Sequence, residues 1–429
     1  MDSKSPNWPI LEFENVCLEK RGAIISGPFG SNIGRKFFVK DGVPVIRGNN
    51  ISEKFELFKD DGFVFVSKNK AEELGTWAIE DDLIFTAAGT LGQVGIIPKK
   101  RKFDKYIISN KQMRARLDKT KVLPFYAFLW FKTGKMVEYI KSRSTGSTIP
   151  LINLSVLRSL PISVPPIAEQ KGIVMVIMSL SNKIELNQKM NKTLEAIAQA
   201  IFKHWFIDFE FPNEEGKPYK SSGGEMVDSE LGEIPKGWKI GYLGDLLNIR
   251  REHCDPSQET RTLPYVPIDC ISKRSLMLTD HKPGEEARSS LIKFHKFDII
   301  FGAMRPYFHK VCIAPFEGTT RTTAFVFYPK YLNDYAFLLL TVFSERTIKY
   351  ANLNSTGSTI PYAAWENSLE TMPIVIPFTE VRHNFNKIIV NLLISIGEYL
   401  PNQIVTLKNI RDSLLPKLMS GKIRVPLED

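Results

Sequence analysis

Two long stretches of the chain place apolar residues at the spacing of an amphipathic α-helix. The first follows Pro165 and Pro166, and its apolar or small residues stand at 173, 177, 180, 184, 194, 198, 201 and 205. The second runs over about 379–420, with Phe385, Ile389, Leu392, Ile396, Tyr399, Leu407, Ile410 and Leu414 on one stripe. Gly421 follows it, and glycine is typical of the position after a helix end. We therefore predict long helices over 167–209 and 379–421.

The two predicted helices are longer than a single small domain needs. About forty residues make a helix of ~60 Å. We therefore favour an antiparallel coiled coil of the two helices over the alternative that each covers only its own domain. Asn187 and Asn191 stand in the middle of the first stripe and would fix its register. Pro401 lacks a backbone donor and should kink or interrupt the second helix.

The rest of the chain consists of short β-branched and aromatic segments broken by Gly, Asn and Pro. We expect an α+β fold with two similar mixed α/β domains, at 1–166 and 237–378, each leading into one long helix. Residues 210–236 are rich in Pro, Gly, Glu and Ser and are predicted to be a surface linker. We predict that residues 422–429 form a tail.

The two domains are related by an internal duplication. Residues 144–150, STGSTIP, recur residue for residue at 355–361. Further landmarks keep the same order: Trp8 with Trp238, 44–52 with 264–272, 82–85 with 298–301, and 161–165 with 373–377. Self-similarity of this kind indicates a repeated structural unit.

Two similar domains on antiparallel helices would form an object with pseudo-twofold symmetry, which suits a DNA duplex. Twofold DNA readers place their reading units about 34–36 Å apart, one helical turn. Here the units are fused and differ in sequence, so we expect an asymmetric, bipartite site.

The net charge favours a polyanionic partner. Lys and Arg number 57 against 47 Asp and Glu, a formal charge of +10. A membrane is the poorer choice, because the longest apolar runs, 173–178 and 336–343, are shorter than a bilayer span. The first residues lack the apolar core of a signal peptide, so a cytoplasmic location is expected.

The four cysteines show no zinc-ligand spacing. We expect reduced, mostly buried thiols at Cys17, Cys254, Cys270 and Cys312, with a Cys254–Cys270 disulfide left open.

Base reading uses Arg, Asn, Gln, Ser or Thr side chains on loops able to enter the major groove, so residues of these types are candidate DNA contacts. The basic stretch 99–116 suits phosphate, although an ordinary solvated basic hairpin is an alternative for each lysine. For His309 a packed or solvent-facing histidine is the favoured interpretation. The candidates are Arg47, Asn49, Asn50, Thr86, Thr90, Lys111 and Arg114 in the first half, and Arg305, Tyr307, His309, Lys310 and Arg321 in the second.

The STGSTIP copies are identical in domains expected to read different bases. This argues against base readout, so we favour a structural role at the domain–helix junction, with phosphate binding second.

Several of these segments together resemble a known family. They are the twin STGSTIP segments, each leading into Pro-Ile-x-Val/Ile-Pro, the run Glu169-Gln170-Lys171, and the chain end RDSLLPKLMSGKIRV at 411–425. Over nearly its full length the chain resembles the specificity subunit of a type I restriction-modification enzyme. The second copy departs from the pattern, with Thr379-Glu380-Val381 where the first has Ala168-Glu169-Gln170.

The resemblance implies that 1–166 and 237–378 are target recognition domains, and that this subunit selects double-stranded DNA while partners carry out the chemistry. Two methyltransferase (modification) subunits would bring S-adenosylmethionine and methylate adenine. Two restriction subunits, motor-nucleases using ATP and Mg, would add translocation and cutting. Shared junctions and helices would dock the modification subunits, and no cofactor is expected on this chain.

The residues themselves agree with a non-catalytic subunit. The sequence has no Asn/Asp-Pro-Pro-Tyr/Phe segment and no glycine fingerprint, and Gly421-Lys422 lacks the upstream glycine of a Walker loop. The six histidines are scattered. Two alternatives stay open, a non-catalytic scaffold and a stand-alone DNA-modifying enzyme with an unrecognised site.

Overall fold

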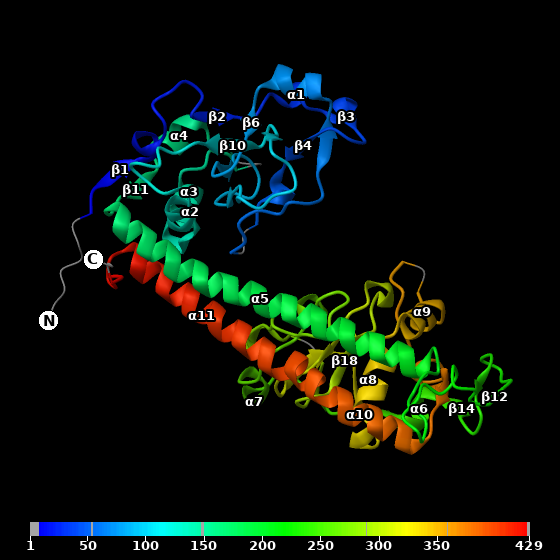
Figure 1. Cartoon of the computed structure of the whole chain (residues 1–429). Coiled ribbons are helices and arrows are strands. Elements are labelled where there is room, and N and C mark those ends of the chain that lie inside the picture. The colour runs from blue at the N-terminus through cyan, green and yellow to red at the C-terminus, as the bar shows by residue number, and fades with distance from the viewer. Residues whose placement is uncertain (1–7, 53–54, 147–149, 289, 358, 427–429) are drawn as a thin grey trace. The chain divides into compact units, whose positions relative to one another are not determined.

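The computed structural model describes residues 8–52, 55–146, 150–288, 290–357 and 359–426. It divides into two compact units. The first unit is Met1–Ser181 with Asn409–Asp429, and the second unit is Asn182–Lys408. Each unit therefore contains one mixed α/β domain and a segment of both long helices (Figure 1).

The first unit is built on two sheets. The four-stranded antiparallel sheet has the order β2–β10–β7–β8, with β2 Ile24–Ser26, β10 Gln112–Ala115, β7 Leu83–Thr86 and β8 Val94–Ile96. The five-stranded sheet has the order β3–β5–β4–β9–β6, with β3 Phe38–Val39, β5 Val64–Val66, β4 Val43–Ile46, β9 Tyr106–Ile108 and β6 Trp77–Ala78. In the second sheet β4 and β9 run parallel. A small pair joins β1, Ile10–Glu12, to β11, Pro161–Ser163.

Helices cover one face of the four-stranded sheet. They are α2 Pro124–Lys132, α3 Gly134–Ser142 and α4 Leu154–Arg158, while α1, Lys68–Leu74, lies beside the other sheet. The core is aromatic, because Phe13 makes edge-to-face contacts with Phe85 and Phe131 at 5.6 and 4.8 Å between ring centroids. This aromatic core stabilises the four-stranded sheet, and candidate residues lie at the ends of its strands.

The second unit repeats the four-stranded sheet of the first. Its four-stranded sheet has the order β15–β21–β18–β19, with β15 Leu247–Ile249, β21 Ala324–Pro329, β18 Ile299–Gly302 and β19 Val311–Ile313. The other strands are β16 His253–Cys254, β17 Leu291–Phe294, β20 Gly318–Arg321, and the pair β14 Lys239–Tyr242 with β22 Pro373–Ile376. The helices are α6 Leu243–Leu246, α7 Gln258–Arg261, α8 Tyr335–Phe343 and α9 Glu345–Leu353.

The matching elements occur in the same chain order. The four-stranded sheets correspond strand for strand, α2 and α3 correspond to α8 and α9, and β1–β11 corresponds to β14–β22. The second sheets differ, because the first unit has five strands there and the second unit has three, in the order β16–β17–β20. Even the short turn after β4, Gly48–Asn50, has a counterpart at Ile268–Cys270. The predicted pair of similar α+β domains is confirmed.

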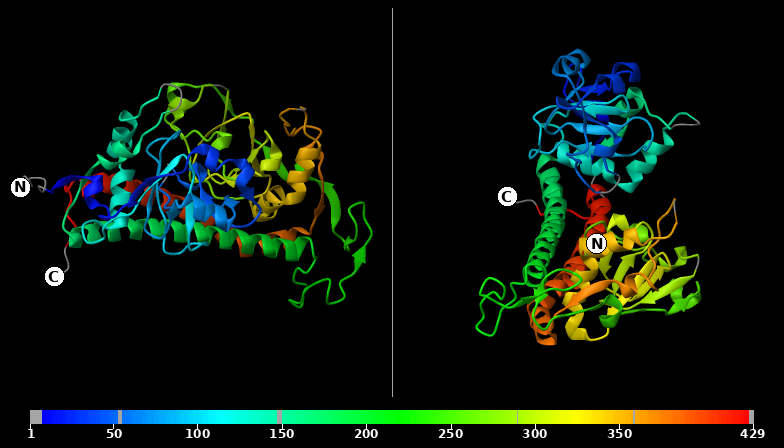
Figure 2. Two further views of the ribbon diagram at one scale, coloured as in Figure 1. Left: turned by 90° about the horizontal axis from the view of Figure 1, so that it is seen from above. Right: turned by 90° about the vertical axis from the view of Figure 1, so that its right-hand side faces the viewer.

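Helix α5, Ile167–Phe206, is 40 residues long and continuous. In the first unit its early residues Ile173 and Ile177 share a core with Leu415 and Leu418 of α11, Leu400–Met419. In the second unit its late residue Phe202 shares a core with Phe385 of α10, Thr379–Ile394. Figure 2 shows from two further directions that the paired segments run side by side within each unit. The helices are thus antiparallel, and the same segments also cover the domain cores, so both predicted roles hold together.

The residues that open α5 are anchors to the first domain. Gln170 is buried, accepts from the Leu123 amide at 2.8 Å and donates to the Pro165 carbonyl at 2.8 Å. Glu169 is buried and pairs with Arg424 through two hydrogen bonds, one of them 2.8 Å. The Glu-Gln pair therefore joins domain, helix and chain end within this unit.

The two asparagines of the stripe have different roles. Asn187 donates to Gln403 of α11 at 3.0 Å, a polar contact across the helix pair of the kind that fixes register. Asn191 instead donates to Glu195 at 2.8 Å, and Glu195 accepts from the Leu276 amide at 2.7 Å. Only Asn187 contributes as predicted, because Asn191 faces the second domain.

The predicted interruption near Pro401 is present. Helix α10 passes into a π-helical turn, Ser395–Tyr399, and α11 begins one residue before the proline. Pro401 cannot donate to the carbonyl four residues earlier, and a π turn accommodates the extra residue. Pro416, in contrast, lies inside α11 without ending it.

By length and composition, the helix over Thr379–Met419 could cross a membrane. Its most apolar window has a mean hydropathy of 1.3 and is 39% buried within the structure. The sequence prediction considered only uninterrupted apolar runs and therefore did not include this helix. The core helix of a soluble protein passes the same test, and Phe385 and Ile389 are fully buried in the second unit.

Most of residues 210–236, predicted as a surface linker, are exposed, and a few aromatic residues hold the segment on the second unit. Phe211 stacks on Tyr219 and on Trp238, with ring centroids 4.6 and 4.8 Å apart. A short hairpin, β12 Met226–Val227 with β13 Ile234–Pro235, follows. A few aromatic anchors in a polar stretch are enough to hold it on the second unit.

Candidate nucleic-acid interface

Three of the candidate segments in the first half meet at one end of the strands. We call residues 26–34, 47–50, 86–90 and 109–111 the first loop edge. The Ser109 amide donates to the Ile46 carbonyl at 2.9 Å, the Ala87 amide to the Lys111 carbonyl at 2.8 Å, and the Gly27 amide to the Gln112 carbonyl at 2.8 Å. Because β4 and β9 are parallel while β2, β10 and β7 alternate, these loops leave the sheets on the same side.

Four of the first-half candidates are accessible at this edge. Asn49, Thr90 and Lys111 are exposed, and Arg47 is partly buried. The Asn49 side chain is exposed, and its amide nitrogen donates to the Gly62 carbonyl at 3.3 Å. These side chains are placed to meet a ligand.

The other first-half candidates are used by the fold. Asn50 is fully buried and donates to the Lys59 and Asp61 carbonyls at 3.0 and 2.8 Å. Thr86 is buried and bonds Gln93 at 3.1 Å. We therefore do not expect Asn50 and Thr86 to contact bases in this conformation.

Arg114, a predicted DNA contact, is also used by the fold. Its side chain is buried, donates to the Ala23 carbonyl at 3.1 Å, and lies 3.8 Å from the Asp82 carboxylate. Burial lowers the pKa of Arg114, and the Asp82 charge opposes that shift. A guanidinium held in this way supports the sheet and is not available to DNA.

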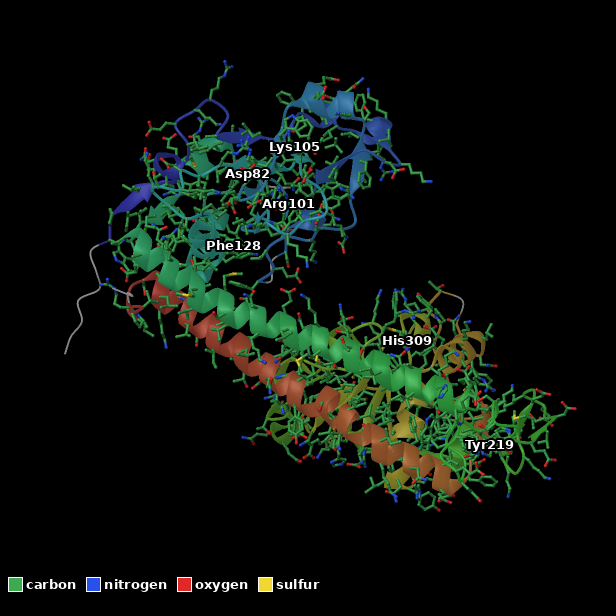
Figure 3. The ribbon with its side chains drawn as sticks, viewed as in Figure 1. Asp82, Arg101, Lys105, Phe128, Tyr219 and His309 are labelled. Carbon is green, nitrogen blue, oxygen red and sulfur yellow. The ribbon has the colours of Figure 1, made fainter. Side chains whose placement is uncertain are left out.

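The basic stretch 99–116 is divided between structure and solvent. Arg101 donates to Glu80 at 2.7 Å, and Arg116 donates to Asp82 through Nε and Nη2 at 2.8 and 2.7 Å (Figure 3 labels Arg101 and Asp82). Lys99, Lys100, Lys102 and Lys105 are exposed. They lie between the end of β8 and the start of β9, which are the strand ends opposite the first loop edge. The stretch is therefore not one phosphate-binding surface.

The buried aspartate is repeated in the second unit. Asp298 accepts from Arg250, at 3.0 Å for one of its two hydrogen bonds, and from the His295 amide at 2.7 Å. In the first unit the arginine comes from the end of β10, and in the second from the end of β15. Such paired, hydrogen-bonded charges are structural, and the strand that supplies the arginine has changed between the copies.

The second-half candidates also gather at one strand end. We call residues 302–310 and 321–323 the second loop edge, since the Gly302 amide donates to the Lys310 carbonyl at 2.8 Å and the Ala303 amide to the Thr323 carbonyl at 2.9 Å. Arg321 is exposed, Tyr307 is 47% exposed, and Arg305 is partly buried. The topology makes this edge the counterpart of the first.

Two second-half candidates are held internally. His309 is buried, with Nε2 2.8 Å from the Phe343 carbonyl oxygen, and burial lowers its pKa (Figure 3). Lys310 donates to the Ile268 carbonyl at 2.6 Å, and burial lowers its pKa as well. His309 is the packed residue favoured from sequence, and Lys310 is at most partly accessible.

The second loop edge has an unusual backbone. Arg305 and His309 have φ angles of 54° and 51°, in the left-handed region that non-glycine residues rarely adopt. Hydrogen bonds from the Arg305 amide to Pro361 and from the Arg274 amide to His309, each 2.8 Å, hold both ends. The short turn between them, Pro306–Phe308, presents Tyr307 to solvent.

The STGSTIP segments support these loops in both units. Thr145 bonds Leu151 at 2.9 Å, and Thr356 bonds Tyr362 at 2.8–2.9 Å, so each segment closes a hairpin. The Pro150 carbonyl accepts from the Gly89 amide at 3.1 Å, as Pro361 does from Arg305. Residues 147–149 and 358 lie outside the described part of the chain. The shared hairpin thus fixes loops whose own sequences differ.

Sequence reasoning missed two exposed residues at the first loop edge, Phe29 and Asn110. The glycine-rich turn SGPFGSN was the available signal. All four cysteines are free; Cys17 and Cys312 are buried, and burial raises the pKa of Cys17 to about 12. Among the described residues no cluster of His, Cys, Asp or Glu could hold a metal ion.

Comparisons with known proteins agree with one another. A family model described as the type I restriction modification DNA specificity domain matches residues 31–196. The specificity subunit of the type I restriction enzyme MjaIX from Methanocaldococcus jannaschii is 31% identical over 359 residues, covering 80% of this chain and 78% of that protein. The HindI specificity subunit from Haemophilus influenzae is 24% identical over 380 residues, covering 75% and 82%.

A solved structure supports the fold. The S subunit of a type I restriction-modification system from M. genitalium aligns with a TM-score of 0.54 at 14% identity, covering 100% of this chain and 99% of that chain. From the fold and the 31% identity over most of both proteins, we conclude that the chain belongs to the family of type I restriction-modification specificity subunits.

Proposed function

We propose that each unit reads one part of an asymmetric, bipartite DNA site through its loop edge. The observation that carries this proposal is that one topology presents different side chains at equivalent edges. The first offers Asn49, Thr90 and Lys111, and the second offers Arg305, Tyr307 and Arg321. Equivalent scaffolds with unlike readers should recognise unlike sequences.

The chemistry is proposed to lie on partner subunits. Two modification subunits would supply S-adenosylmethionine and methylate adenine, and two restriction subunits would use ATP and Mg to translocate and cut. This chain would select the site and position the partners without a catalytic group of its own. A complex acting on chromosomal DNA belongs in the cytoplasm of its host.

The proposal is tested by mapping N6-methyladenine in a host that contains the modification subunits, with and without this gene. We expect one methylated motif, with two specified parts around a fixed spacer, to disappear with the gene. The absence of any motif change would contradict DNA selection and favour a scaffold. Methyl transfer or DNA cleavage by the isolated chain would favour a stand-alone enzyme.

A further inference from the structure

The first loop edge carries an exposed phenylalanine. Phe29 is 83% exposed, whereas most phenylalanines of a folded protein are largely buried. Leaving an apolar ring in water forgoes the stabilisation of burial, roughly 25 cal/mol per Å². Phe29 therefore contributes little to the folded first unit in this conformation.

The loop that holds Phe29 is fixed against the edge. Gly27 lies so close to the Ser109 carbonyl that a side chain there would collide with it. A Cβ at Gly30 would stand 3.0 Å from the Asn110 side-chain nitrogen. The Phe29 carbonyl accepts from the Asn32 amide at 2.9 Å, which closes a tight turn. The ring is thus presented beside Asn110 and Lys111 on a supported turn.

The sequence segments that form and flank this loop are basic. Residues 20–40 contain no acidic residue, and Arg35, Lys36 and Lys40 are exposed. Residues 105–117, which include the exposed Lys111, contain none either. A surface that combines basic side chains with an exposed aromatic ring fits nucleic acid, where phosphates pair with the cations and bases offer apolar faces.

We propose that Phe29 is the apolar contact between the first unit and DNA, and that its ring presses against the bases of the part of the site that this unit reads. The inference rests on the proposed function. The ring would meet either an opened base step, as apolar wedge residues do, or a thymine methyl group in the major groove.

The test compares Phe29→Ala with Leu332→Ala in the complex with the modification subunits. Leu332 is a matched control, because it is also 83% exposed but follows β21 at the strand end opposite the second loop edge. We expect Phe29→Ala to weaken binding to the mapped site by about 10-fold or more, the scale of losing one aromatic–base contact. Leu332→Ala should stay within about two-fold, since its loss removes no DNA contact.

Two further readouts separate contact from structure. The melting temperature and the salt dependence of binding should be unchanged in Phe29→Ala, because neither a buried group nor a phosphate contact is removed. Phe29→Trp should retain most of the affinity. A 2-aminopurine probe that brightens with wild type but not with Phe29→Ala identifies an opened step, and a loss on replacing thymine by uracil identifies the methyl group.

Equal affinity of wild type and Phe29→Ala would overturn the inference while leaving the proposed function standing. A defect in assembly with the modification subunits, with normal DNA affinity once assembled, would also overturn it and identify a protein contact. Failure of the wild-type complex to select any duplex would instead refute the proposed function.

Discussion

Glu195 should be the strongest single attachment of α5 to the second domain. Its side chain is 5% exposed and accepts from Ser275 Oγ at 2.9 Å and from the Leu276 amide at 2.7 Å. Glu195→Ala would leave these two donors, and the Asn191 amide that also donates to Glu195, without an acceptor, at ~1–3 kcal/mol for each unsatisfied group. We expect a loss of about 3 kcal/mol, which corresponds to a fall in Tm of about 6–12 °C for a unit of this size.

Thermal unfolding followed by circular dichroism measures this effect. Glu185→Ala is the control on the same helix, because Glu185 is exposed and its ion pair is with exposed Lys189 at 2.5 Å. That variant should change stability by less than about 0.5 kcal/mol. Glu195→Gln keeps one acceptor oxygen and should fall between the two. Equal melting of Glu195→Ala and Glu185→Ala would refute the reasoning.

Three further predictions follow from individual contacts. Lys111→Ala should reduce the slope of log affinity against log salt by about one, measured by titration at several salt concentrations; an unchanged slope would remove Lys111 from the phosphate contacts. Gly397→Ala should destabilise the second unit by ~1–2 kcal/mol in urea unfolding, because its Cβ would stand 2.6 Å from Ile313, and a gain in stability would show that the helix can move. Burial lowers the pKa of His309, so the unfolded chain binds the proton more readily and stability should fall as the pH drops below about 6.5. His309→Gln should remove that part of the pH dependence, and an identical pH profile would show that His309 is not its source.

The duplication and the helices could be predicted because one leaves an identical sequence repeat and the other leaves a local periodic pattern. A stripe through Ile173, Ile177 and Ile184 requires only helical periodicity, and STGSTIP is visible as a repeat. The interruption near Pro401 likewise follows from one missing donor.

The site was only partly predictable because side-chain type does not reveal which partner the fold supplies. Arg114 is buried because β10 pairs with β7, which brings Asp82 beside it. The Asn50 amide nitrogen donates to the carbonyls of residues 59 and 61, which are too far along the chain for a local sequence pattern to indicate the contact. Phe29 shows the reverse, since an aromatic residue expected in a core is held at the surface by a turn packed against Ser109.

Exchange of one loop of the second loop edge tests most directly whether each unit reads its own part of the site. Residues 303–308 would be replaced by the corresponding loop of a relative with a different motif, and methylated adenines would then be mapped with the assembled complex. We predict that one specified part of the motif changes while the other part and the spacer length stay the same. An assembled, active complex that methylates the original motif, or one in which both parts change, would contradict independent reading by the two units.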